Sequence, residues 1–263
     1  MRYALDVQYI GKNYAGSQIQ FEKKETQIER NEPTIQGELE KALRTLIVSR
    51  IDSAKNIRPI RTIFSGRTDK GVNALGQVVH FDYDKDIVAS KFIYQMNEIL
   101  PNDISVDNLR IVPESFHAQK SAKARYYRYE LINRRYKQAF DGDILRVKYD
   151  LDVERMQTAL NFLIGEHDFS SFKSSGTLNP SKVCFITRAE VEKLGDRILI
   201  HIEGNRFLYN MVRTIVGTLL EIEGHKLPPE HMKDVLEARD RRKAGRTVSP
   251  YGLTLVRVDY SCA

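Results

Sequence analysis

Hydrophobic and polar positions along the chain repeat in two periods, one typical of strands and one of helices. Tyr3, Leu5, Val7 and Tyr9 recur at every second position, which predicts a half-buried strand over residues 2–10. The same alternation or a short apolar run predicts further strands at residues 77–83, 104–112, 124–132, 183–193, 197–203 and 252–260.

Between these strands, apolar residues recur three or four positions apart, which predicts amphipathic helices. The longest such stripe covers residues 208–224. Other helices are predicted over residues 35–49, 91–100, 152–164 and 229–239. For the helix at 91–100, Ser90 is the expected N-cap and Pro101 the expected stop. Residues 17–33 are polar and charged, which predicts a loop.

The order of these elements indicates the fold class. Strands follow one another in pairs and helices come in blocks of one or two, which favours an α+β fold over a doubly wound α/β fold. The least structured central stretch is residues 113–121. We therefore predict two halves, residues 1–115 and residues 116–263.

Composition narrows the class of partner. The 263 residues carry 41 Lys and Arg against 35 Asp and Glu, a net charge of +6. This basic balance suits nucleic acid or phosphate, but many proteins of similar charge bind nothing acidic. The two cysteines, Cys184 and Cys262, lack zinc-ligand spacing, so a reducing cytoplasm is expected. No signal-peptide layout and no run of 18 apolar residues is present, so no membrane is expected.

The segment "GRTDKG", residues 66–71, allows three interpretations. It can be a tight turn that leads into the strand at 77–83, since glycine permits turn conformations. A phosphate loop fits poorly, because the GxxxxGK[ST] pattern is absent. It can also be an active-site loop, in which Asp69 is a nucleophile or base and Arg67 keeps it ionised. The segment alone leaves the turn and the active-site loop open.

The aromatic segment "ARYYRYEL" in the strand at 124–132 is equally ambiguous. Alternation places Arg125 and Tyr127 on one face, and Tyr126, Arg128 and Glu130 on the other. Tyrosines interleaved with arginines suit stacking on bases and contact with phosphates. They also suit a sheet with tyrosines in its core and arginines in water.

Arg213 is unusual in the helix at 208–224, because it lies at the margin of the apolar stripe, four positions after Tyr209. A part-buried arginine needs a carboxylate or phosphate partner. Alternatively, its stem packs and its charged head stays in water. The sequence of the helix leaves both open.

In this order, the motifs resemble those of the tRNA pseudouridine synthase A family. "SGRTDKGVNALGQVVHF" is similar to the family's catalytic motif, "ARYYRYELIN" to its tyrosine motif and "FLYNMVRTIVGTLLEIEGHK" to its third motif. "TIQGELEKAL", "GEHDFSSF" and "GLTLVRVDY" match as well, so the resemblance runs from about Tyr9 to Tyr260. Lys70 and Asn73 depart from it, since the family often has Ala and His there.

The resemblance implies an isomerase that converts uridine to pseudouridine in the anticodon stem-loop of tRNA, at tRNA positions 38 to 40. It implies that Asp69 is the catalytic aspartate, that Tyr127 stacks on the target uracil and that Arg213 pairs with Asp69. Arg67 is expected to help extrude the target nucleotide or to occupy its vacated place. A base inside a stem must be flipped out before such chemistry.

The resemblance also implies the architecture and the partners. Two related α/β-sandwich-like halves are expected around an extended, mostly antiparallel mixed sheet, in a cytoplasmic homodimer that binds tRNA. The reaction is redox-neutral, so no cofactor and no metal is expected. The alternatives are an RNA-binding protein on the same scaffold whose catalysis has lapsed, and an aspartyl-phosphate enzyme. The presence of Asp69, Tyr127 and Arg213 together argues against the first, and the absence of recognisable Mg²⁺ ligands argues against the second.

Overall fold

The computed structural model describes residues 1–19, 32–48, 60–174 and 181–260. Its internal contacts divide the chain into two compact units, Met1–Ala122 with Tyr260–Ala263, and Lys123–Asp259. The predicted boundary between residues 115 and 116 lies in the loop that precedes β5 (Ala122–Asn133). The contacts divide at the first residue of this strand.

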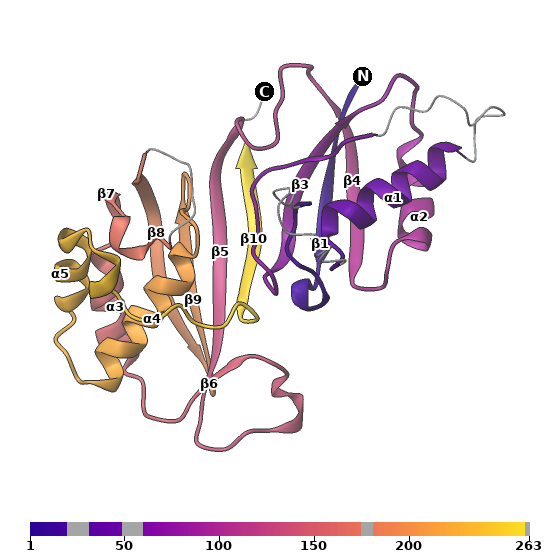
Figure 1. The fold of residues 1–263 in the computed structure, drawn as a ribbon. Coiled ribbons are helices and arrows are strands. Elements are labelled where there is room, and N and C mark those ends of the chain that lie inside the picture. The colour runs from indigo at the N-terminus through magenta and orange to yellow at the C-terminus, as the bar shows by residue number, and fades with distance from the viewer. Residues whose placement is uncertain (20–31, 49–59, 175–180, 261–263) are drawn as a thin grey trace, which may run out of the picture. The chain divides into compact units, whose positions relative to one another are not determined.

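The first unit is a small antiparallel sheet with two helices (Figure 1). Its central strand β1 pairs with β4 on one side and with β3 on the other, and β3 also pairs with the short strand β2. Phe92 of α2 stacks on Phe81 of β3 at 6.1 Å between ring centroids. The elements are β1 (Arg2–Tyr9), α1 (Ile35–Val48), β2 (Ile63–Phe64), β3 (Asn73–Asp82), α2 (Ala89–Ile99) and β4 (Ile104–Val112).

The second unit is a larger sheet with the strand order β10-β5-β9-β8-β7, and its helices α3, α4 and α5 pack together (Figure 1). The β5–β9, β8–β9 and β7–β8 pairs are antiparallel, whereas β6 pairs with β5 in parallel. The elements that follow β5 are β6 (Leu145–Val147), α3 (Val153–Asn161), β7 (Gly165–Asp168), β8 (Val183–Leu194), β9 (Arg197–Gly204), α4 (Met211–Gly224), α5 (His231–Ala238) and β10 (Leu253–Tyr260).

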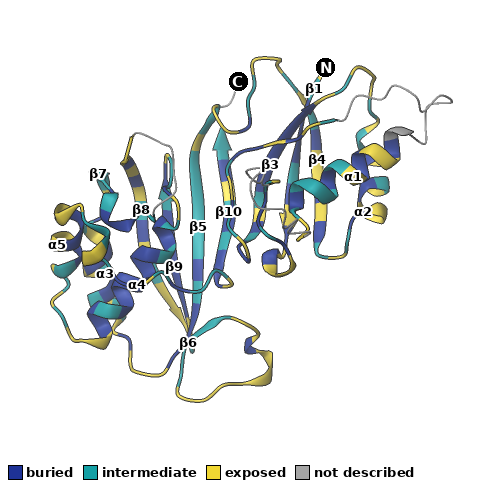
Figure 2. Cartoon of the chain, viewed as in Figure 1, coloured by how far each residue is buried: buried dark blue, intermediate teal, exposed yellow. Residues whose placement is uncertain are grey.

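Burial follows the predicted apolar periods (Figure 2). On β1, Tyr3, Leu5, Val7 and Tyr9 are all buried, as their alternation predicts. Helix α4 is buried on most of its surface, which explains its broad apolar stripe. The α+β class and the mostly antiparallel pairing of the strands are confirmed.

Element ends are where the predictions were wrong. Helix α2 begins at Ala89 after Val88, so Ser90 lies inside the helix and is not its N-cap. Helix α4 begins at Met211 rather than at residue 208. The short strands β2, β6 and β7 were not predicted. Most of the loop predicted at 17–33 lies outside the described residues. No helix among the described residues is long and apolar enough to cross a membrane.

His80 of β3 makes the stability of the first unit depend on pH. It is buried, its Nδ1 accepts a hydrogen bond from the backbone N–H of Ala118 at 3.1 Å, and its ring lies 5.1 Å from that of His117. Burial, together with the smaller effect of the nearby charge of Arg2, lowers the pKa of His80 to about 4. Protonation would also convert Nδ1 into a donor that cannot accept from Ala118.

We therefore expect the protein to lose stability below about pH 6.5, the ordinary pKa of histidine, because His80 takes up a proton first in the unfolded chain. The loss attributable to His80 is about 2 kcal/mol between about pH 7.5 and pH 5. Urea unfolding of wild type and His80→Gln measures it, and the wild type should show the steeper fall. His225→Gln, a change at an exposed histidine, should keep the wild-type slope. Equal slopes for wild type and His80→Gln would contradict this assignment.

Candidate functional site

Asp69 lies on a loop between β2 and β3 that is clamped to the segment after β1. Asp69 forms an isolated β-bridge with Gly16, and the backbone N–H of Ser17 donates to the Thr68 carbonyl at 3.0 Å. In return, the backbone N–H of Thr68 donates to Oγ of Ser17 at 2.8 Å. The hydroxyls of Thr68 and Tyr9 share a buried hydrogen bond of 2.8 Å. These contacts fix the backbone on the N-terminal side of Asp69.

The other support of the loop is Gln77, a fully buried side chain on β3. Its Nε2 donates to the Gly66 carbonyl at 3.1 Å, and its Oε1 accepts from the Ser65 hydroxyl at 2.5 Å. Gly16 has φ +130°, and a Cβ there would lie 2.9 Å from the Thr68 carbonyl oxygen, so only glycine permits this approach. The loop is therefore rigid at its base, while Asp69 stays partly exposed.

The side chains on either side of Asp69 also have defined partners. Arg67 is exposed, and its Nε donates to Oε1 of Gln18 at 2.6 Å. Lys70, which stands where the family motif often has Ala, forms an ion pair with Glu32 at 2.7 Å. The positive charge that Lys70 adds to the loop is therefore balanced by a carboxylate. Burial raises the pKa of Tyr9 to about 12, so its hydroxyl stays protonated far above neutral pH.

In the second unit, the predicted Tyr127 lies on β5, on the same face as Tyr129. The half-buried ring of Tyr127 meets that of Phe207 edge to face, with 5.0 Å between centroids. Tyr129 is completely buried, and its hydroxyl donates to the Ser249 carbonyl at 2.9 Å. Burial raises the pKa of Tyr129, and the positive charge of Arg213 acts in the opposite direction. Tyr129 therefore belongs to the core, and Tyr127 lies at its margin.

Arg213 lies in the first turn of α4 and is oriented by neutral acceptors. Its Nη1 donates to Oδ1 of Asn210 at 2.7 Å, and its Nε donates to the Val248 carbonyl at 2.8 Å. Asn210 has φ 62°, in the left-handed region, and its amide donates to the Ser174 hydroxyl at 3.0 Å. These contacts hold the guanidinium in place.

The segment that carries Val248 packs directly against the backbone of α4, because glycines at the contact have no side chain. A Cβ at Gly217 would lie 1.8 Å from the Arg246 carbonyl oxygen, and one at Gly245 would lie 2.6 Å from Gly217. The hydroxyl of Thr218 accepts from the backbone N–H of Gly245 at 3.0 Å. The backbone acceptor of Arg213 is thus positioned by glycines on two elements.

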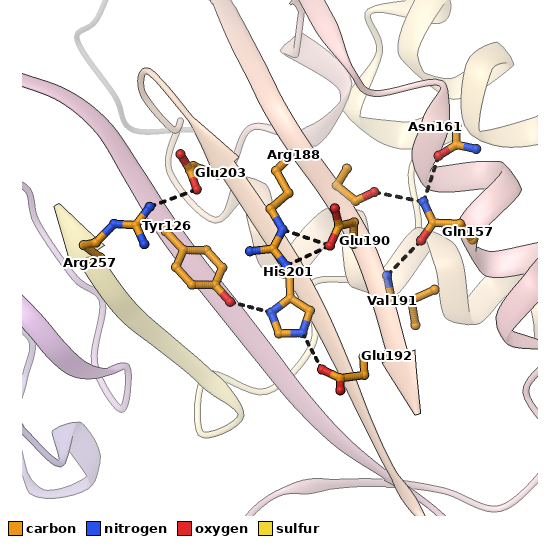
Figure 3. Close-up of polar contacts among 11 residues, drawn as sticks. Tyr126, Gln157, Asn161, Arg188, Glu190, Val191, Glu192, His201, Glu203 and Arg257 are labelled. Carbon is orange, nitrogen blue, oxygen red and sulfur yellow. Dashed lines mark hydrogen bonds and ion pairs between the residues drawn. The ribbon is translucent and has the colours of Figure 1, made fainter. Parts of the chain in front are cut away.

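The opposite face of the β5–β9–β8 sheet carries a polar network (Figure 3). The Tyr126 hydroxyl hydrogen-bonds Nδ1 of His201 at 2.6 Å, and Nε2 of His201 lies 3.4 Å from Glu192. The guanidinium groups of Arg188 and Arg257 lie over the Tyr126 ring, at 5.4 and 5.6 Å from its centroid. The predicted separation of Tyr126 and Tyr127 onto opposite faces is confirmed. Tyr126 is engaged in this network.

The predicted residues come from both units of the chain. Asp69 and Arg67 share one loop of the first unit, whereas Tyr127 and Arg213 lie on the helix-covered side of the second unit. The pairing of Asp69 with Arg213 stays a prediction. Among the described residues, no group of three or more His, Cys, Asp or Glu side chains is placed to hold a metal ion.

Gln77 and Asn210, which help to hold these side chains in place, were not predicted from the sequence. Both lie inside the recognised motifs, but their roles depend on contacts with segments 11 and 36 positions away. Asparagine just before a helix is a common cap, and this could have pointed to Asn210. No comparable local pattern marks Gln77.

Comparisons with known proteins give a consistent result over the whole chain. A family model described as tRNA pseudouridine synthase matches residues 159–261. A tRNA pseudouridine synthase A of Bacillus licheniformis is 40% identical over 261 residues, which are 99% of both chains. The enzymes of that name from Thermoanaerobacter pseudethanolicus and Halalkalibacterium halodurans are 38% and 42% identical, over 97% and 96% of this chain and 97% and 90% of theirs.

One solved structure, a Cbf5-Nop10-Gar1 complex, is a more distant match. Its TM-score is 0.37 at 10% sequence identity, and the alignment covers 96% of this chain and 57% of that chain.

Proposed function

Because this chain belongs to the tRNA pseudouridine synthase A family, whose members are isomerases that convert uridine in tRNA to pseudouridine, we propose that it acts on the anticodon stem-loop with Asp69 as its catalytic group. The target uridines are those at tRNA positions 38 to 40. The observation that carries the catalytic assignment is the loop of Asp69, which is fixed at its base by Ser17 and Gln77 and presents a partly exposed carboxylate.

The chemistry needs an ionised carboxylate beside the sugar of the target nucleotide. The bond between C1′ and N1 of uracil breaks, the uracil turns, and a bond forms between C1′ and C5. The proton on C5 then leaves, and N1 gains one, so no electrons enter or leave the system. Asp69 acts either as the nucleophile at C1′ or as a base at the sugar, and both roles require the deprotonated form.

Arg213 and Tyr127 have complementary roles in this proposal. Arg213 pairs with Asp69 and favours its charged form, because an opposite charge nearby lowers the pKa of a carboxylate. Tyr127 stacks on the detached uracil, and its phenolic oxygen accepts the C5 proton as its own hydroxyl proton passes to water. The half-buried ring of Tyr127, supported edge-on by Phe207, suits such a stacking surface.

The target base must leave the stem before it can reach Asp69, which costs a few kcal/mol of stacking and pairing. Arg67 suits this step, because it is exposed on the loop of Asp69, where its Nε donates to Gln18. In our proposal it helps extrude the nucleotide or fills the space that the nucleotide leaves. The two halves, residues 1–115 with the Asp69 loop and residues 116–263 with Tyr127 and Arg213, act together in a cytoplasmic homodimer.

The site of modification is tested by mapping pseudouridine in unmodified tRNA transcripts after incubation with the wild-type enzyme. Carbodiimide adducts that stop reverse transcription locate each pseudouridine. We expect stops at positions 38 to 40 and none in transcripts whose uridines at these positions are replaced by cytidine. Stops at other positions of the tRNA, unaffected by that replacement, would contradict the proposed location.

A further inference from the structure

The 134–144 loop, which joins β5 to β6, is held in one shape by polar contacts of its own. The Arg134 guanidinium forms ion pairs with Asp141, which is buried, and with Asp196. Asp141 also accepts from the backbone N–H of Gln138 at 2.8 Å, and Nε of Arg134 donates to the Tyr136 carbonyl at 3.0 Å. The base of the loop is closed by an Arg146 guanidinium that donates to the Arg135 carbonyl at 2.5 Å.

This braced loop exposes two aromatic side chains. Phe140 is 98% exposed and Tyr136 is 73% exposed, and they are the two most exposed large hydrophobic side chains of the described residues. The loop buries the polar side chain of Asp141 and leaves its neighbour Phe140 in water. This reverses the usual preference of each residue type, which indicates that the rings are kept outside for a partner.

The outer surface of the loop is basic. The guanidinium of Arg135 lies 5.6 Å from the centroid of the Tyr136 ring, and Lys137 is exposed beside it. Asp141 turns inward to Arg134, so Asp143 is the one acidic residue of residues 134–144 that remains on the exterior. Aromatic rings flanked by cations match a ligand that offers both flat bases and phosphates.

We propose that the 134–144 loop is a second RNA-binding site, at which Phe140 and Tyr136 stack on unpaired bases of the tRNA. Arg135 and Lys137 contact the phosphates of the same strand. The inference rests on the proposed function, since it takes tRNA as the substrate. Asn133, where the loop leaves β5, lies six residues after Tyr127, about 20 Å along the strand. The loop therefore contacts a different part of the RNA from the target nucleotide.

The neighbours of the two rings favour RNA over a protein partner. A protein-binding patch usually has an apolar centre depleted of charge, especially of lysine. Here the exposed residues that accompany Tyr136 and Phe140 are Arg135, Lys137, Gln138, Ala139, Gly142 and Asp143. This surface is too polar to form such a centre, but single-stranded RNA is bound by surfaces of this composition.

Substitutions at Phe140 distinguish stacking from simple apolar contact. We expect Phe140→Ala and Phe140→Leu to raise the Kd for a full-length tRNA transcript roughly 5- to 100-fold, and Phe140→Trp to keep it within about twofold. Fluorescence anisotropy with labelled tRNA measures these values. Tyr94→Ala, which removes a 66% exposed ring on α2, is the matched control and should leave the Kd unchanged. Because Phe140 is almost fully exposed, all three variants should keep the wild-type Tm.

The contribution of charge is tested separately. Lys137→Gln should lower the slope of log Kd against log salt concentration by about one, as expected for one lost phosphate contact. An unchanged Kd for Phe140→Ala would overturn the inference, and so would a Phe140→Leu variant that binds as tightly as Phe140→Trp. Sedimentation velocity is run on the same samples. A different result would also overturn the inference: Phe140→Ala binds tRNA weakly when dilute but regains the wild-type Kd at concentrations at which it self-associates. In that case the loop contacts a second copy of the chain rather than RNA.

These measurements separate the loop from the proposed function. If wild type binds tRNA but forms no pseudouridine, the proposed function fails, and the loop is still judged by the Kd values of its variants. If wild type forms pseudouridine and the Phe140 variants bind tRNA normally, the loop inference fails and the proposed function stands.

Discussion

An Asp69→Asn variant is expected to form pseudouridine roughly 10³- to 10⁴-fold more slowly than wild type, because the amide can act neither as a nucleophile nor as a base. The loop should keep its shape, since its contacts to Gly16, Ser17 and Gln77 use backbone atoms and other side chains. The Tm should therefore stay within a few degrees of that of wild type. Single-turnover reactions with excess enzyme, followed by nucleoside analysis of the digested tRNA, give the rate.

Asp84→Asn is the matched control for this change. Asp84 is exposed on the same unit, after β3, and no role in the site is proposed for it. Its rate should equal that of wild type within about twofold. If both Asp69→Asn and Asp84→Asn keep the wild-type rate, Asp69 cannot be the catalytic group.

Arg213→Ala is expected to reduce turnover about 10²- to 10³-fold while the Kd for tRNA changes much less. An ion pair between unit charges 4 Å apart at an effective dielectric of 20 is worth up to about 4 kcal/mol, and the variant loses this support of the charged form of Asp69. Arg213→Lys should lose activity too, because one ammonium group cannot reproduce the fork that reaches both Asn210 and Val248.

The pH dependence gives this prediction its second readout. Without Arg213, the pKa of the catalytic carboxylate rises, so activity should begin to fall at a higher pH than in wild type as the solution is acidified. Arg242→Ala, which removes a 90% exposed arginine that follows α5, should leave this acidic limb unchanged. A loss of tRNA affinity that accounts for the whole effect of Arg213→Ala would contradict the pairing with Asp69.

The strands and helices could be predicted well where the apolar period is long. The alternation of Tyr3, Leu5, Val7 and Tyr9 predicted β1, because one face of that strand is buried along its whole length. Strands of two to four residues, such as β2 and β7, offer too few positions for a period to appear.

Helix ends escaped prediction because they depend on backbone geometry rather than on apolar period. The stripe of α4 begins at Leu208, but the helix begins only after Asn210, whose left-handed conformation interrupts the turn. Ser90 fitted the composition of an N-cap, yet α2 begins one residue before it.

The candidate site shows the same limit. The residues around Asp69 fit a turn as well as an active-site loop, and the local sequence could not decide between them. What makes the loop rigid is contact with Ser17 and Gln77, and Ser17 is 51 positions from its partner Thr68. The ion pair of Lys70 with Glu32 spans 38 positions. Such partners are set by the tertiary fold, so they could be found only in the structure.

The release of tritium from tRNA labelled at C5 of uridine tests the central claim most directly, because the C5 proton leaves only when C5 becomes bonded to C1′. We predict that wild type releases tritium from the anticodon stem-loop uridines and that Asp69→Asn, under the same conditions, releases none above the control without enzyme. Equal release by wild type and Asp69→Asn would contradict catalysis by the Asp69 loop. Release by neither protein, with tRNA still bound, would contradict the proposed isomerase activity.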